Sequence, residues 1–208
     1  EDYTIESDWS ASSYWYEIMA LNANRDSELQ LDGLSDCTKQ GDSVVKYIFS
    51  LLGVKSDFEL RDRIAPLKLK AHRCTLPRLD YDFTGSPDLA QTIVVACCAM
   101  GVHFRFTGLA TLKIKETDRI EALKRELRKV SYVIRDENDN TLIWEGETCE
   151  PTLEPIDTYE DHRMAMAFAP LAFKFPQLQI NHPEVVTKSY PHFWEDLRSV
   201  GFIITEKA

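Results

Sequence analysis

The chain has 208 residues, 44% of them hydrophobic and 28% charged, which is typical of a globular protein with one large domain or two small ones. Its net charge of −10 argues against nucleic acid or an anionic membrane as the main partner. No apolar run approaches the roughly 20 residues of a membrane-spanning helix. The first residues, EDYTIESDWS, lack Met and the features of a signal peptide, so we expect a piece of a longer chain.

Cysteine and histidine usage bears on compartment and metal binding. The cysteines number five, and Cys97 and Cys98 lie in the apolar run TIVVACCAMG. None has metal-ligand spacing, and the five histidines do not cluster. We therefore expect reduced core cysteines, a cytoplasmic protein and no metal site.

In chain order, the sequence predicts one unit three times. Segments that can cap a helix and are then apolar on nearly all sides predict buried helices at 7–22, 86–101 and 159–175. Helices with one apolar face are predicted at 41–54, 117–130 and 190–202, and β-branched or alternating stretches predict strands at 102–108, 132–136, 141–146, 178–182 and 201–206. These repeats favour one α/β domain of pseudo-threefold symmetry, with helices inside, sheets around them, and units at roughly 1–75, 76–148 and 149–208.

Two predicted helix entries carry unusual charges. Lys115 and Glu116 precede the helix for which we expect Thr117 to be the N-cap, and Arg119 falls in its first turn. A cation is mildly unfavourable there because the helix dipole is positive at this end. Two cations at a helix N-terminus are explained if an anion binds between them, whereas the alternative is a solvated loop.

The second such entry, YEDHRMAM, places Asp161, His162 and Arg163 before an apolar helix. A stabilising cap needs only one Asp, although a capping Asp with exposed neighbours is the simpler alternative.

Two further residues stand at predicted helix starts. Asp88 alone would be an ordinary N-terminal acid, and Lys188 occupies the repeat position of Lys115. Together with the cations above, they suit a ligand with several negative charges and a reaction that includes proton transfer. No phosphate-binding loop, dinucleotide fingerprint or serine-nucleophile motif is present in the sequence.

These residues lie in motifs that resemble those of the 5-enolpyruvylshikimate-3-phosphate synthase family. The motifs are KETDR (115–119), DHRMAMAF (161–168), PDLAQT (87–92) and TKSYPHFW (187–194), with QGD (40–42) and, less strictly, SDWSASSY (7–14). The resemblance covers nearly the whole chain. It implies an inside-out α/β barrel of three βαβαββ units, as one of the two domains of an enzyme that binds its substrates between them.

The activity implied by the resemblance belongs to the shikimate pathway, which leads to chorismate and the aromatic amino acids. The enzyme transfers the enolpyruvyl group of phosphoenolpyruvate to the 5-hydroxyl of shikimate 3-phosphate, releases phosphate, needs no metal or organic cofactor and is a monomer. This chain would be its C-terminal domain. Without the N-terminal part, which carries a further Lys, a glycine-containing anion loop and Ser/Gln contacts, we expect the piece to be inactive.

The resemblance also implies roles for the proton-transferring residues. Asp88 would take the proton of the 5-hydroxyl and orient shikimate 3-phosphate. Glu116 would protonate the methylene carbon of phosphoenolpyruvate and later remove a proton. Lys115 would contact shikimate 3-phosphate and support Glu116.

The implied roles of the remaining cations concern phosphoenolpyruvate. Arg119, Arg163 and Lys188 would hold its carboxylate and phosphate, and His162 would contribute weakly. Thr111 stands where some family members have a substrate-contacting Asn, so that contact is left open.

Three other functions compete with this interpretation. A UDP-N-acetylglucosamine enolpyruvyl transferase would share the architecture and chemistry, but KETDR with DHRMAM argues against it. An RNA 3′-phosphate cyclase would share the repeat unit, but we would expect it to carry a basic nucleic-acid footprint. A non-catalytic module would be expected to have incomplete charged helix entries.

Overall fold

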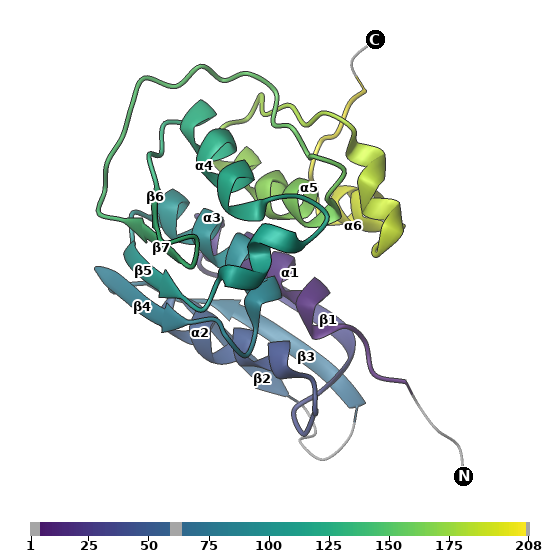
Figure 1. Cartoon of the computed structure of the whole chain (residues 1–208). Coiled ribbons are helices and arrows are strands. Elements are labelled where there is room, and N and C mark those ends of the chain that lie inside the picture. Colours follow the sequence, from purple (N-terminus) through teal and green to yellow (C-terminus); the bar gives the residue numbers. More distant parts are fainter. Residues whose placement is uncertain (1–4, 59–63, 207–208) are drawn as a thin grey trace.

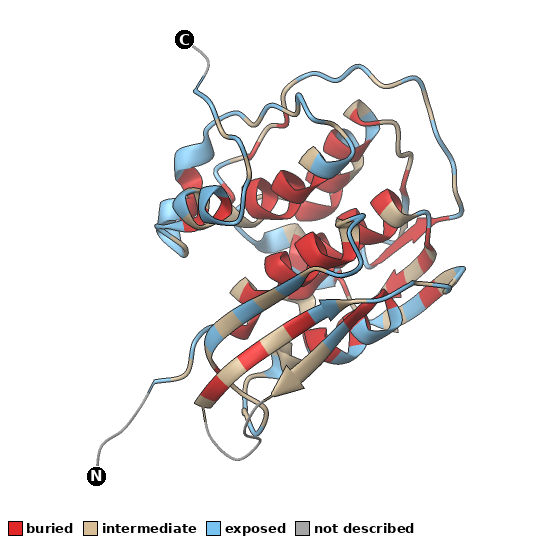
Figure 2. Cartoon of the chain, turned by 180° about the vertical axis from the view of Figure 1, so that it is seen from behind, coloured by how far each residue is buried: buried red, intermediate tan, exposed pale blue. Residues whose placement is uncertain are grey.

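A computed structural model describes residues 5–58 and 64–206 of the chain. At its centre lie three helices, α1 (Trp9–Leu21), α3 (Ala90–Met100) and α5 (His162–Phe168), which Figures 1 and 2 show as a buried layer between the outer elements. Helix α3 packs against both α1 and α5. The prediction of an α/β domain with buried helices is confirmed.

The interior helices follow from their composition and their ends. In α3, every residue from Ala90 to Ala99 is buried, and small side chains allow the close approach of its neighbours. The helix ends at Gly101, whose φ of 73° lies in the left-handed region that glycine adopts without strain. Among residues 5–58 and 64–206, no helix is long and apolar enough to cross a membrane.

The outer helices are α2 (Val45–Leu51), α4 (Arg119–Lys129) and α6 (Phe193–Ser199), each shorter than its predicted segment. The prediction that Thr117 caps α4 is wrong. The cap is Asp118, whose carboxylate accepts a hydrogen bond from the amide of Glu121 at 3.1 Å. Arg119 is therefore the first residue of α4. Short 3₁₀ turns complete the helical elements: η1 (Gly41–Val44), η2 (Pro87–Leu89), η3 (Ala110–Ile114), η4 (Ala169–Phe173) and η5 (Pro183–Lys188).

Two sheets cover the interior helices. The first has the antiparallel order β1-β3-β2 and contains β1 (Glu28–Ser35), β2 (Val54–Phe58) and β3 (Ile64–Ala71). The second has the order β4-β5-β7-β6 and contains β4 (Arg78–Asp82), β5 (His103–Thr107), β6 (Arg135–Glu137) and β7 (Thr141–Trp144). In this sheet β4 and β5 are parallel, because the chain crosses over through α3 between them.

The third unit differs from the prediction. Within the described residues, 178–182 and 201–206 form no strand, and the only pairing there is an isolated parallel bridge between Ile156 and Ile180. An extended segment becomes a strand only when a neighbour completes its hydrogen-bond ladder. Ile203 instead has 94% of its surface exposed. The division into three units at about residues 75 and 148 stays a prediction.

One buried acid makes the stability of the fold depend on pH. Glu17 of α1 has no exposed surface, and within the described part of the chain neither of its carboxylate oxygens has a hydrogen-bond partner. Burial raises the pKa of Glu17 well above its ordinary value, because the charged form would be desolvated. The folded state therefore holds a proton that the unfolded state releases at lower pH.

We expect the free energy of unfolding to fall as pH rises from the ordinary glutamate pKa towards the folded one, by up to about 1.4 kcal/mol per pH unit. In Glu17→Gln this contribution is absent. The free energy of unfolding of the variant, relative to that of the wild type, should therefore increase as pH rises. Urea unfolding between about pH 5 and pH 9 measures this. Exposed Glu150→Gln is the control, and a constant difference between Glu17→Gln and wild type would contradict the assignment.

Candidate functional site

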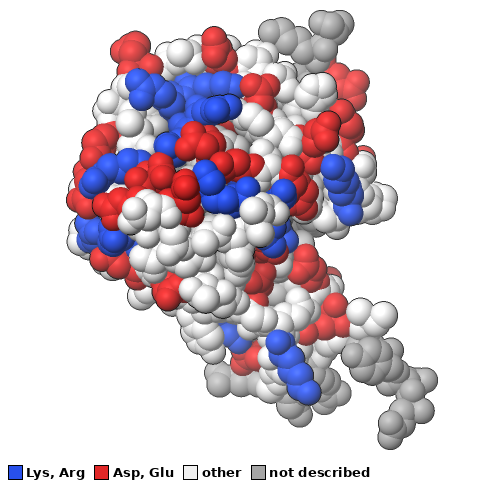
Figure 3. Space-filling model, viewed as in Figure 1, with Lys and Arg blue, Asp and Glu red and all other residues white. Residues whose placement is uncertain are grey.

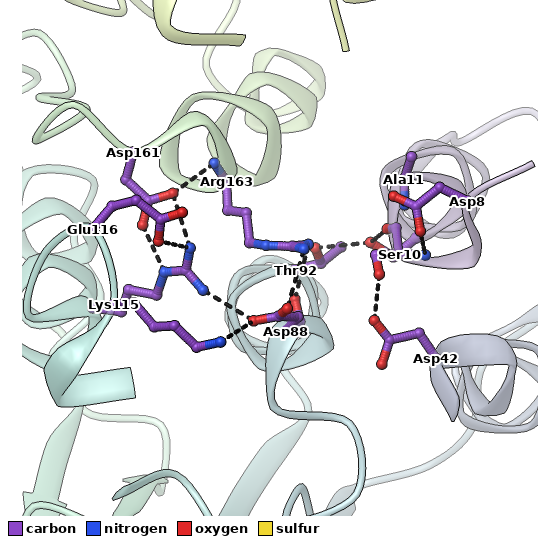
Figure 4. A network of polar contacts seen from close by, with 12 residues as sticks. Asp8, Ser10, Ala11, Asp42, Asp88, Thr92, Lys115, Glu116, Asp161 and Arg163 are labelled. Carbon is purple, nitrogen blue, oxygen red and sulfur yellow. Dashed lines mark hydrogen bonds and ion pairs between the residues drawn. The ribbon is translucent and has the colours of Figure 1, made fainter. Parts of the chain in front are cut away.

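The N-terminal ends of the three interior helices meet at one place, where acidic and basic side chains gather (Figure 4). Helices α1 and α3 are joined there by a hydrogen bond of 3.1 Å between the hydroxyls of Ser13 and Thr92. Arg163 joins α5 to the turn η2, which leads into α3, by donating to the carboxylate of Asp88 at 3.2 Å. Helix N-termini carry free amide groups and a positive dipole end, so this place favours negative charge.

Arg119 is the centre of the cluster. Its side chain is 1% exposed, and its guanidinium contacts three carboxylates. The Nε atom donates to Asp161 at 2.6 Å, one terminal nitrogen donates to Asp88 at 3.1 Å, and the other donates to Glu116 at 2.6 Å. A buried cation requires such partners to offset its desolvation. The negative charge expected beside this first-turn cation is thus supplied in the structure by the chain itself.

Asp88 lies in η2, directly before α3, and its side chain is 29% exposed. Besides Arg119 and Arg163, it lies 3.4 Å from the ammonium group of Lys115. Partial burial acts to raise the pKa of Asp88, but Arg163, Lys115 and Arg119 together hold it below its ordinary value. Asp88 is therefore ionised at neutral pH and faces three cations.

Glu116 and His162 form the more open side of the cluster. Burial acts to raise the pKa of Glu116, but its own backbone amide, Arg119 and His162 keep it below its ordinary value. Burial and the neighbouring Arg163 lower the pKa of His162, so its imidazole is neutral at pH 7. The Nδ1 atom of His162 is buried and has no hydrogen-bond partner among the described residues.

Lys188 reaches the site from the end of η5. It is exposed, and its ammonium group donates to the backbone carbonyl of Glu160 at 2.8 Å, directly before the residues that open α5. The structure thus brings five of the predicted site residues into direct contact, namely Asp88, Lys115, Glu116, Arg119 and Arg163. Lys188 and His162 lie at their border, while Thr111 is exposed on η3 and its role stays open.

Two residues of the cluster were not predicted from the sequence to belong to the site, although Asp161 was considered as a helix cap. Asp161 is fully buried, caps α5 by accepting from the amide of Arg163 at 2.8 Å, and also binds Arg119. Asp42, in the QGD motif, accepts a hydrogen bond from the hydroxyl of Ser10 and extends the network to the first turn of α1. Burial raises the pKa of Asp42 above its ordinary value. The motif QGD was the only signal for it.

The surroundings of the site are mixed in charge. Figure 3 shows basic and acidic side chains side by side on the face that carries α4. Within the described residues, no group of three or more His, Cys, Asp or Glu is arranged to hold a metal ion. Cations set among carboxylates suit a small anion better than a nucleic-acid backbone, which calls for a basic stripe.

Comparison with known proteins identifies the family to which the chain is similar. The sequence profile of the family described as EPSP synthase (3-phosphoshikimate 1-carboxyvinyltransferase) matches residues 1–197. A 3-phosphoshikimate 1-carboxyvinyltransferase of Bacteroides fragilis is 52% identical over 201 residues, which are 96% of this chain and 48% of that protein. One from Cellvibrio japonicus is 32% identical over 197 residues, which are 92% of this chain and 43% of that protein.

A solved structure shows the same fold. The EPSP synthase of Acinetobacter baumannii, solved at 2.37 Å, superposes with a TM-score of 0.73 at 20% identity and covers 97% of this chain and 47% of its own. The chain spans about half the length of the curated relatives that it matches.

Proposed function

This chain belongs to the EPSP synthase family, and from that premise we propose that it supplies part of an active site for enolpyruvyl transfer. The group would pass from phosphoenolpyruvate to the 5-hydroxyl of shikimate 3-phosphate, with release of phosphate, on the route to chorismate and the aromatic amino acids. The observation that carries the proposal is the single cluster in which Arg119 joins Asp88 and Glu116 beside Lys115 and Arg163.

The cations would bind the two anionic substrates. We assign the carboxylate and phosphate of phosphoenolpyruvate to Arg119, Arg163 and Lys188, and shikimate 3-phosphate to Lys115 and Asp88. Lys188 and Lys115 are exposed and can receive an anion directly. Arg119 is 1% exposed, so a substrate oxygen would reach it only by replacing Glu116 or Asp88 at a terminal nitrogen.

Two carboxyl groups would move the protons: Asp88, which is ionised, and Glu116, which carries a proton once the substrates are bound. Asp88 takes the 5-hydroxyl proton as the oxygen bonds to C2 of phosphoenolpyruvate, and Glu116 gives a proton to the methylene carbon. Glu116 then removes a proton from the resulting methyl group while the bond from C2 to the phosphate oxygen breaks, and Asp88 passes its proton to the departing phosphate. Fixed cations stabilise the charges that develop along this path.

Substrate binding would prepare both groups for these steps. The cations beside Asp88 and Glu116 now hold both pKa values down. A bound phosphate or carboxylate shares those cations and adds negative charge, which raises both pKa values. Asp88 then becomes a stronger base, and Glu116 becomes able to carry a proton. The neutral imidazole of His162 would make a weaker contact with the substrate.

The wider setting is also part of the proposal. We propose that the substrates lie between this domain and a second one. We also propose that the enzyme formed by the two domains is a cytoplasmic monomer and uses no metal or organic cofactor. Cys97 and Cys98 are buried in α3, which agrees with a protein whose cysteines stay reduced.

The test joins this chain to the portion of the Bacteroides fragilis relative that it does not match. We expect the joined protein to release phosphate from phosphoenolpyruvate only when shikimate 3-phosphate is present, and the chain alone to release none. UDP-N-acetylglucosamine is the comparison acceptor. Phosphate release from phosphoenolpyruvate with UDP-N-acetylglucosamine but not with shikimate 3-phosphate would show that the acceptor is misassigned. Turnover by the chain alone would refute the need for a second domain.

A further inference from the structure

Glu126 lies on α4, two turns after Arg119, and it is fully buried. Its carboxylate accepts hydrogen bonds from the hydroxyl of Tyr159 at 2.5 Å and from the amide of Asp157 at 2.9 Å. Lys129 of the same helix lies 2.7 Å away and balances the charge. A buried carboxylate is thus fixed on the segment that leads into α5.

That segment makes an unusual turn. Tyr159 and Glu160 have φ values of 53° and 57°, in the left-handed region that residues with side chains seldom adopt. The turn closes with a hydrogen bond of 2.9 Å from the amide of Asp161 to the carbonyl of Thr158. Two consecutive residues in this conformation persist only where their surroundings hold them there.

The turn presents two groups to the site. The carbonyl of Glu160 accepts from Lys188, and the carboxylate of Asp161 accepts from Arg119. Helix α4 therefore holds residues 157–161 at two points on one face, through Arg119 at one end and Glu126 seven residues later. If the hydrogen bonds to Glu126 are lost, the turn can relax. The carbonyl of Glu160 and the carboxylate of Asp161 would then move with it.

We propose that Glu126, acting through Tyr159, is a positioning residue of this site: it holds the turn 157–161 and thereby places Lys188 and Arg119 for a bound anion. The part of this proposal that concerns a bound anion rests on the proposed function. The part that concerns the position of the turn rests only on the contacts of Glu126. Lys129 reinforces it, since its ammonium group also donates to the carbonyl of Pro155 and lies 2.9 Å from Asp157.

The test compares three variants of the full chain. Glu126→Gln keeps the shape but removes the charge and one acceptor, and Tyr159→Phe removes a single hydroxyl. The control is Glu121→Gln, which alters a glutamate of the same helix that pairs with Lys124 outside the site. Amide hydrogen exchange at Asp161 and Arg163 reports the turn, and titration with inorganic phosphate reports the site.

We expect Glu126→Gln to speed exchange at those two amides by about tenfold and to weaken phosphate binding by about three- to tenfold, on the scale of one charge-assisted hydrogen bond. Tyr159→Phe should act in the same direction but less, and Glu121→Gln should match the wild type. Exchange in α3 should not change in any of them.

Two outcomes would overturn the proposal. One is wild-type exchange at Asp161 and Arg163 in Glu126→Gln. The other is faster exchange by the same factor throughout the chain, because this would show general destabilisation. If the wild type binds no phosphate, the proposed anion site fails, while the exchange result still decides whether Glu126 holds the turn.

Discussion

In the joined protein, Asp88→Asn is expected to lower the rate of phosphate release by about 10²- to 10⁴-fold, the usual contribution of a general base. Asn keeps the shape of the side chain and can still accept from Arg119, but it cannot take the 5-hydroxyl proton. Binding of shikimate 3-phosphate should change far less, since Lys115 is retained. Single-turnover phosphate release at saturating substrates, together with a binding titration, separates the two effects.

The control for this variant is Asp80→Asn, which alters an aspartate of β4 that is 57% exposed and pairs with Arg78. It should leave the rate unchanged. Glu116→Gln should reduce the rate in a similar way to Asp88→Asn, because it removes the second proton-transfer group. A rate near that of the wild type in Asp88→Asn would show that another group takes the proton.

Arg119→Met is expected to lower the free energy of unfolding of the chain by about 3–5 kcal/mol, the usual cost of removing one partner of a buried ion pair. The loss leaves Asp161, which has no exposed surface, without the cation that it binds through two nitrogens. Equilibrium unfolding in urea at neutral pH measures the change.

Two further variants separate this effect from the general loss of an arginine. Arg128→Met alters an exposed arginine of the same helix and should change stability by less than about 0.5 kcal/mol. Adding Asp161→Asn to Arg119→Met should restore part of the loss, because the buried negative charge is then gone. An effect of Arg119→Met as small as that of Arg128→Met would mean that Asp161 is not held as an ion in the core.

The sequence predicts the centre of this fold well. The three buried helices are apolar on nearly all sides, and a helix of that kind has no stable position on a protein surface. The strands at 103–107 and 141–144 alternate or are rich in β-branched and aromatic residues, and they lie where that pattern places them.

The sequence predicts poorly what depends on a neighbour. The segments 178–182 and 201–206 have the composition of strands, but pairing is decided by a partner that composition does not reveal. The start of α4 was misplaced by one residue for a local reason. Thr117 and Asp118 can both cap, and only the geometry shows that Asp118 reaches the amide of Glu121.

The same distinction applies to the site. Cations placed against the dipole at two helix entries mark the site in the sequence, since local rules give them no stabilising role. Their partners could not be inferred. Arg119 and Asp161 are 42 residues apart, and Arg163 and Asp88 are 75 apart. Only the convergence of the starts of α3, α4 and α5 brings each carboxylate to its cation.

The most direct test of the account is phosphate release by the chain joined to the unmatched portion of the Bacteroides fragilis relative. The account predicts steady release with phosphoenolpyruvate and shikimate 3-phosphate together, no release with either one alone, and a near-complete loss in Asp88→Asn. Two results would contradict the assignment of this cluster as half of an enolpyruvyl transfer site. One is a folded joined protein that releases no phosphate with both substrates, and the other is an Asp88→Asn variant that releases phosphate as fast as the wild type.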